Sequence, residues 1–355
     1  MADLKQDKTR DRNFYFDFLR ALAIFAVIIL HNSADQVDQY GKLPTTDWLS
    51  AAFYNGLTRF CVPMFVLLSG ALLLDPAKEI TIKELFTKRL PRLVIPLLVW
   101  SVFYEIFQYS TDKGYGQFHL IVALKTFYQG PLVFHFWFLY MLIGIYLIYP
   151  VLNAFVRAAS RSLVFYFIVL WFITNCVFGM IGIIYGLSLG VELYGFTGYL
   201  GYFMLGYYLQ HFSFSKQQLN IIYGLGILSI VASIAATVLL HTQGDKSALE
   251  IIESDFTPEI PFTLAGLFLL LKNHAFGPGQ TWFKSVMSQL GRESYGIYIV
   301  HVLWMRLLFD KLYLGLGFGN QSLLWVIPFK GIVVLALSYG LTKLIRLVPL
   351  LRATV

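Results

Sequence analysis

Charged residues are scarce in this sequence of 355 residues. Asp, Glu, Lys and Arg make up 13% of it, whereas hydrophobic residues make up 57%. A soluble domain carries about 25% charged residues, so this chain has too few charges to cover a globule of its size in water. The composition therefore favours a membrane protein, and the 17% aromatic content suits lipid-facing surface and interfacial belts.

Cysteine is nearly absent as well. Cys61 and Cys176 are the two cysteines, both inside apolar runs and without the spacing of metal ligands. The sequence holds no H-E-x-x-H motif, and no Cys, Ser or Thr stands out as a nucleophile. We therefore expect no disulfide framework, no metal site and no permanently bound cofactor.

Long apolar runs are abundant. A spanning helix needs about 20 mostly apolar residues, and ten runs approach this length: 14–34, 54–74, 93–110, 132–155, 163–186, 194–212, 219–241, 258–271, 287–309 and 322–345. The sixth run is rich in Gly and Tyr, and the eighth needs its flanks to span. The sequence predicts one all-α domain over residues 1–355, a polytopic bundle of about ten transmembrane helices without an internal repeat.

The distribution of Lys and Arg orients this bundle. With the N-terminus inside, 18 of the 27 basic residues fall on inside segments, 5 fall in outside loops and the rest lie within spans. Positive charge favours the cytoplasmic side, so both termini are expected inside. The net charge of +7 is explained by this topology, and we expect membrane lipids around the chain and no nucleic-acid partner.

Polar groups in the first run are candidates for function, because charges at membrane depth are costly. Arg20 and His31 are eleven residues apart. On an α-helix this spacing places two residues within about 20° of the same direction and separates them by roughly 16 Å along the axis. Asp17 joins the same face. Arg20 is then expected nearer the cytoplasm and His31 nearer the outer side. A structural alternative is an interfacial Asp17–Arg20 ion pair and a helix-end histidine.

Further candidates lie in other runs. Pro91 suits the first turn of a helix, so Arg89 and Arg92 would flank a helix N-terminus, where anions bind, although cytoplasmic loops carry positive charge in any case. The remaining candidates within the spans are Arg59, Glu105, His135 and His301, while Arg306 suits snorkelling to the outer interface.

Taken together, these residues resemble the acyltransferase 3 family of bacterial membrane proteins over essentially the whole chain. The resemblance rests on Asp17-Phe18-Leu19-Arg20 with His31, on Arg59 with Val62-Pro63-Met64 through Gly70, and on Arg89-x-x-Arg92. The stretch from His135 and Trp137 to Tyr149-Pro150, and Tyr295-Gly296-Ile297-Tyr298 with His301, complete it. No single motif is specific, but their order in a ten-span chain is.

The resemblance implies a compact O-acyltransferase without a fused extracytoplasmic domain, located in the bacterial cytoplasmic membrane. Acyl-CoA, acetyl-CoA above all, would be the co-substrate, and a cell-surface glycan or its lipid-linked precursor the acceptor. His31, Arg20 and Asp17 would be catalytic, with His31 as general base, and Arg89 and Arg92 would bind acyl-CoA. Arg59, His135, His301 and Glu105 are expected around the acceptor or the oxyanion.

Two other classes stay open from the sequence. A transporter or exporter of a glycan or small molecule would also use ten spans and histidines near the midplane, but it would consume no thioester. A non-catalytic scaffold or sensor would tolerate substitution of the candidate residues. The sequence leaves open the acceptor, acetyl against succinyl transfer, a covalent acyl-histidine, the oligomeric state and the leaflet of the acceptor.

Overall fold

The structure is a computed structural model. It describes residues 2–77, 80–111, 125, 127–187, 190–191, 198–243, 250–251, 254–274, 276, 281–308 and 321–355, with residues 2–13 and 108–111 described by their backbone alone. These residues form helices and no strand, so the predicted all-α fold is confirmed. Residue 309, the residues before 198 in the predicted span 194–212, and the loop lysines Lys78, Lys113, Lys246 and Lys311 lie outside the described residues.

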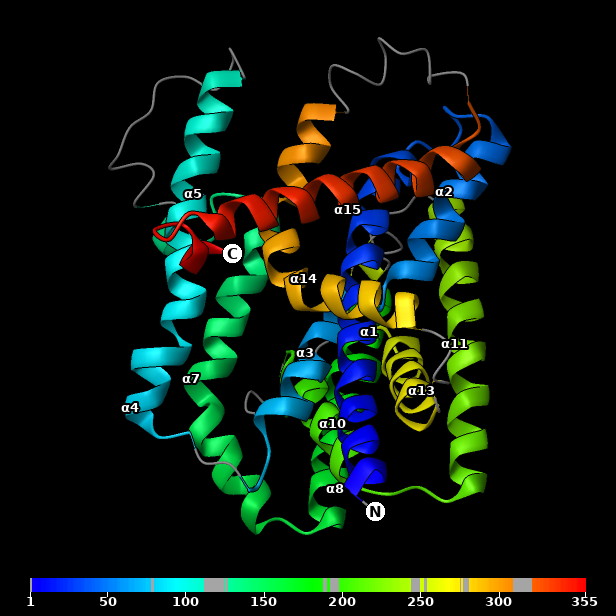
Figure 1. Cartoon of the computed structure of the whole chain (residues 1–355). Coiled ribbons are helices and arrows are strands. Elements are labelled where there is room, and N and C mark those ends of the chain that lie inside the picture. Colours follow the sequence, from blue (N-terminus) through cyan, green and yellow to red (C-terminus); the bar gives the residue numbers. More distant parts are fainter. Residues whose placement is uncertain are drawn as a thin grey trace.

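The helices form one bundle (Figure 1). The α-helices are α1 (Ala2–Val37), α2 (Thr45–Thr58), α3 (Cys61–Leu73), α4 (Ile82–Glu84), α5 (Pro91–Thr111), α7 (Trp137–Ala158), α8 (Arg161–Trp171), α9 (Phe178–Tyr185), α10 (Leu200–His211), α11 (Lys216–Gln243), α13 (Glu259–Asn273), α14 (Thr281–Leu308) and α15 (Leu323–Leu347). Shorter π or 3₁₀ turns are η1 (Leu85–Arg89), η2 (Phe134–Phe136), η3 (Phe172–Val177) and η7 (Arg352–Thr354).

Seven helical segments of the described chain are long and apolar enough to cross a membrane. They are Phe14–Val37, Thr45–Leu73, Ile82–Phe107, Phe134–Ala158, Arg161–Tyr185, Lys216–Gln243 and Leu323–Leu347. The three other predicted spans correspond to α10 and α13, which have 12 and 15 residues, and to α14, which carries Arg292, Glu293 and Arg306. The number of ten spans and the orientation stay predictions.

Helix α1 lies at the centre of the bundle (Figure 1). It packs against α2, α3, α13, α14 and α15, and Leu19, Ile24 and Ile28 on its surface are fully buried. Helix α15 runs across α1 and α14 at a steep angle rather than alongside them. The first span, which carries the predicted functional face, is therefore surrounded by other helices of the bundle.

Glycine allows α3 and α10 to approach each other closely. A Cβ on Gly70 would lie 1.8 Å from the carbonyl oxygen of Phe203, and one on Gly206 would lie 1.9 Å from that of Leu67. Small residues at such contacts let two helix backbones meet within a membrane.

We expect Gly70→Ala to lower the melting temperature of the purified protein, because the added methyl group must push α3 and α10 apart. Overpacking of this kind costs about 1–3 kcal/mol. Gly144→Ala on α7 is the matched control, since its Cβ would meet nothing within 4 Å. Equal melting temperatures for both variants in thermal unfolding would contradict the close helix contact.

Candidate functional site

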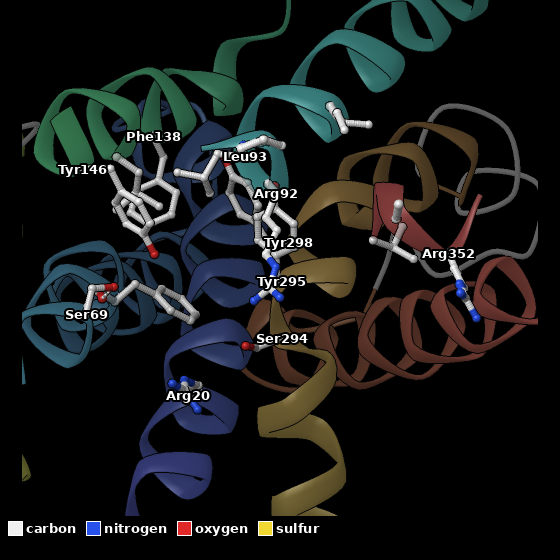
Figure 2. A pocket seen from close by; sticks show the side chains of 16 residues that line it. Arg20, Ser69, Arg92, Leu93, Phe138, Tyr146, Ser294, Tyr295, Tyr298 and Arg352 are labelled. Atoms are coloured by element: carbon white, nitrogen blue, oxygen red, sulfur yellow. Dashed lines mark hydrogen bonds between the residues drawn. The ribbon is translucent and has the colours of Figure 1, made fainter. Parts of the chain in front are cut away.

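Three arginines line one cavity of about 510 Å³. Arg20 comes from α1, Arg92 from α5 and Arg352 from η7 (Figure 2). Most of the remaining wall is apolar or aromatic, and its lining residues are Phe65, Ser69, Pro91, Leu93, Ile95, Phe138, Leu142, Tyr146, Ser294, Tyr295, Tyr298, Ala353 and Val355. A cavity that joins cations to an aromatic wall suits a ligand with an anionic end and a less polar remainder.

Arg20 is held by the neighbour that the sequence predicted. Its Nη1 lies 3.5 Å from Oδ1 of Asp17, and Arg292 is within electrostatic range of the same carboxylate. Tyr146 on α7 is also within electrostatic range of Arg20. A guanidinium has five N–H donors, so a single long contact leaves Arg20 able to bind a further anion in the cavity.

The segment before α5 departs from the prediction of a helix N-terminus that binds anions. Helix α5 does begin at Pro91, but α4 and η1 lead into it with one intervening residue, Leu90. The amides of Leu93 and Val94 donate to the carbonyl of Leu90, at 2.9 Å each. Because these amides are already used, the start of α5 offers an anion its side chains rather than its backbone.

The two arginines of the Arg-x-x-Arg motif have different surroundings. Arg92 lines the cavity, and the hydroxyl of Tyr295 donates to its carbonyl at 3.2 Å. Arg89 does not line the cavity, and its Nη2 lies 3.5 Å from Oε1 of Glu84. Both are within electrostatic range of Tyr146. The geometry therefore favours Arg92 as the direct ligand-binding residue of the pair.

Three histidines that are distant in sequence come together. The ring of His301 on α14 is centred 5.5 Å from that of His31 on α1 and 5.3 Å from that of His135 on η2. His135 and His301 are 2% and 0% exposed, while His31 is partly exposed. No group of three His, Cys, Asp or Glu in the described ranges has the geometry of a metal site. Because imidazole gains and loses a proton near neutral pH and can both donate and accept hydrogen bonds, the cluster is suited to proton transfer and hydrogen bonding.

Close packing of α14 against α1 aligns two of these histidines. A Cβ on Gly291 would lie 2.1 Å from the carbonyl oxygen of Asp17, so glycine lets the two backbones touch at this level. Ten residues further along α14, His301 reaches the ring of His31. The same helix contact thus places Arg20 beside the cavity and His31 beside His301.

The hydrogen bond of His301 fixes which ring nitrogen is free. Its Nδ1 lies 2.6 Å from the carbonyl oxygen of Tyr298, and because a carbonyl can only accept, Nδ1 carries the proton. Nε2 of His301 is buried and has no hydrogen-bond partner in the part of the chain that the structure describes. In the neutral ring Nε2 is an acceptor, so His301 suits holding an N–H or O–H group better than stabilising an oxyanion.

Tyr298 separates the cavity from the histidines. It lines the cavity together with Phe138, whose ring is centred 5.4 Å away. Its hydroxyl donates to the carbonyl of His135, and its own carbonyl accepts from His301. The cationic cavity and the histidine cluster are therefore adjacent regions that share one residue.

Arg59 belongs to another cluster. Its Nη2 donates to the carbonyl of Ser254 at 3.1 Å, and the hydroxyl of Tyr199 donates to Oδ2 of Asp255 at 2.5 Å. Burial raises the pKa of the Asp255 carboxyl, and the Tyr199 hydrogen bond and the Arg59 charge oppose that shift. Arg59 thus ties the 254–257 loop to α2. Glu105, also a predicted site residue, is partly buried on α5.

The sequence reasoning missed several residues of this region. Tyr104 packs on His135 with ring centres 5.5 Å apart, and Arg306, expected at the outer interface, is within electrostatic range of His135. Tyr146 looked like an ordinary aromatic residue of a span. Arg352 looked like one more positive charge of a cytoplasmic segment, and no local pattern distinguishes it.

The family model described as an acyltransferase domain, that of the acyltransferase 3 family, matches residues 13–343. The chain belongs to the acyltransferase 3 family. It is a multi-pass membrane acyltransferase, in agreement with its apolar helices. No curated protein and no solved structure gives a significant match to this acyltransferase. The match covers both the histidine cluster and most of the cavity, but ends before η7.

Proposed function

We propose that this acyltransferase moves an acyl group, acetyl in the simplest case, from acyl-CoA to a hydroxyl of a cell-surface glycan or its lipid-linked precursor. The site of action would be the bacterial cytoplasmic membrane. The observation that carries the proposal is the shared wall at Tyr298, which joins a cavity lined by arginines to a cluster of three histidines. A phosphorylated donor and a reacting hydroxyl need these two environments side by side.

The donor's phosphates would bind at the arginine side. Arginine is well suited to phosphate oxygens, and Arg20 and Arg92 both line the cavity. The long, thin arm of the donor would lie along the aromatic wall and pass Phe138 and Tyr298 toward the histidines. The helical rise of roughly 16 Å between Arg20 and His31 provides the separation that such an arm spans.

The reaction would take place at His31. As general base, His31 removes the proton of the acceptor hydroxyl while the hydroxyl oxygen attacks the thioester carbonyl carbon. The carbon–sulfur bond then breaks, and the departing thiolate takes the proton back from the imidazolium. His135, as the sequence suggested, and Arg306, from its place near His135, are the candidates for stabilising the oxyanion, whereas Arg59, the other candidate from the sequence, lies in the cluster around Ser254 and Asp255. A covalent acyl-His31 intermediate is the alternative route.

The neutral His301 ring supports His31 in this scheme. The ring that carries this unpartnered acceptor, Nε2, is centred 5.5 Å from the His31 ring. It can therefore orient an N–H of His31 or the incoming hydroxyl. Asp17, which pairs with Arg20 at the far end of the same helix face, would keep that guanidinium turned to the cavity rather than touch the reacting atoms.

Calorimetry with the protein in nanodiscs tests the proposal. Acetyl-CoA should bind the wild type, bind Arg89→Ala/Arg92→Ala much more weakly, and bind His31→Ala as tightly as the wild type. The absence of binding of both acetyl-CoA and succinyl-CoA to the wild type would contradict the proposal and favour the transporter alternative, which needs no thioester.

A further inference from the structure

Arg352 lines the cavity although it lies beyond residues 13–343, the part matched by the family. The geometry points to Arg352 as a third phosphate-binding residue of the donor site, one that selects donors carrying a phosphate monoester apart from their diphosphate. This inference rests on the proposed function, because it assigns one further contact to the same donor.

The turn that carries Arg352 is firmly docked. Nε1 of Trp100 on α5 donates to the carbonyl of Thr354 at 2.9 Å in a buried hydrogen bond. The amide of Arg352 itself donates to the carbonyl of Val348 at 3.0 Å, and Thr354 and Val355 are 4% and 8% exposed. The backbone of Arg352 is thus held beside the cavity while its side chain stays exposed.

The charges around the cavity suit a ligand with several phosphates. None of the side chains that line the cavity in the described ranges is acidic. Neither Arg92 nor Arg352 forms an ion pair with any residue of the described ranges. Unpaired guanidinium groups around one cavity repel each other, and a polyanion relieves that repulsion. A general excess of Lys and Arg in cytoplasmic segments does not explain this arrangement, because Arg92 on α5 and Arg352 on η7 are distant in sequence and line the same cavity.

The position of each arginine suggests which phosphate it takes. The hydroxyl of Tyr295, on the helix that also carries Tyr298 and His301, donates to the carbonyl of Arg92, whereas Arg352 stands apart from Arg92 in the view of Figure 2. A coenzyme A thioester has a diphosphate that continues into the thioester arm and a separate 3′-phosphate on its ribose. Arg20 and Arg92 would therefore hold the diphosphate, and Arg352 the 3′-phosphate.

Removal of that phosphate from the ligand gives a direct test. Acetyl-CoA and its 3′-dephospho form are titrated into wild type, Arg352→Ala and Arg352→Gln in nanodiscs. Lys88→Ala is the control for loss of one exposed positive charge, since Lys88 does not line the cavity. Because a hydrogen bond between charged groups is strong, we expect the wild type and Lys88→Ala to prefer acetyl-CoA by about 10–100-fold. Both Arg352 variants should bind the two ligands equally.

The outcomes separate this inference from the proposed function. Arg352 variants that keep the wild-type preference for acetyl-CoA would overturn the inference and leave the proposed function intact. A wild type that binds neither ligand would overturn the proposed function, and this inference with it. If Arg352→Ala does not fold, Arg352→Gln, which removes the charge but keeps a polar side chain, gives the decisive comparison.

Discussion

Replacement of His31 by alanine is expected to lower the rate of acyl transfer by about 10²–10⁴-fold, the contribution typical of a general base. Donor affinity should not change, because His31 does not line the cavity that holds the arginines. The measurement is the release of coenzyme A thiol by the purified protein in the presence of acceptor, with donor affinity determined on the same samples.

The matched control is His274→Ala. His274 is exposed and follows α13, outside the three-histidine cluster, so its removal should leave the rate unchanged. A His31→Ala variant that acylates the acceptor at the wild-type rate would eliminate both the general-base and the acyl-histidine mechanisms. An equal loss in both variants would show that the effect reflects general damage to the protein.

Arg92→Ala is expected to raise the KM for acyl-CoA by about 10–100-fold with little change in kcat. A hydrogen bond to a charged group contributes about 1.5–3 kcal/mol, and a contact with the phosphates far from the reacting atoms is made equally in the ground and transition states. Steady-state kinetics with varied donor separates the two constants.

Arg89→Ala provides the comparison within the same motif. Arg89 pairs with Glu84 and lies outside the cavity lining, so its removal should raise the KM by a few-fold at most. The reverse order, with Arg89→Ala the more damaging substitution, would contradict the placement of the donor in this cavity.

The spacing of residues along one helix could be predicted from the sequence. Asp17, Arg20 and His31 lie on one face of α1 as helical periodicity requires, and the Asp17–Arg20 ion pair, which the sequence offered as a structural alternative, is present. Pro91 begins α5, as its missing N–H favours. These features depend on local geometry, which a sequence specifies directly.

Convergence between distant segments could not be predicted in this way. His135 and His301 were each candidates, but periodicity does not reveal that both meet His31. That meeting depends on contact between α1 and α14 at Gly291, and on η2, a turn that the apolar pattern merges with the following helix. The position of Tyr298 between the cavity and the histidines depends on the α1–α14 contact and on η2, so the sequence alone could not predict it.

The largest difference between prediction and structure concerns the start of the helix at Pro91. The Pro91 signal suggested a free helix N-terminus, but residues 82–89 are already helical, and the amides of Leu93 and Val94 donate to the carbonyl of Leu90. Anion binding therefore depends on the side chains at this point, and Arg92 and Arg89, equivalent in the sequence, differ because one faces the cavity and the other faces Glu84.

The most direct test of the central claim is a structure of the His31→Ala variant with acetyl-CoA bound, since loss of the base should preserve the intact donor. The account predicts phosphates between Arg20 and Arg92, the arm along Phe138 and Tyr298, and the thioester carbonyl beside His135 and His301. A donor bound elsewhere, or a thioester that points away from the histidines, would contradict it.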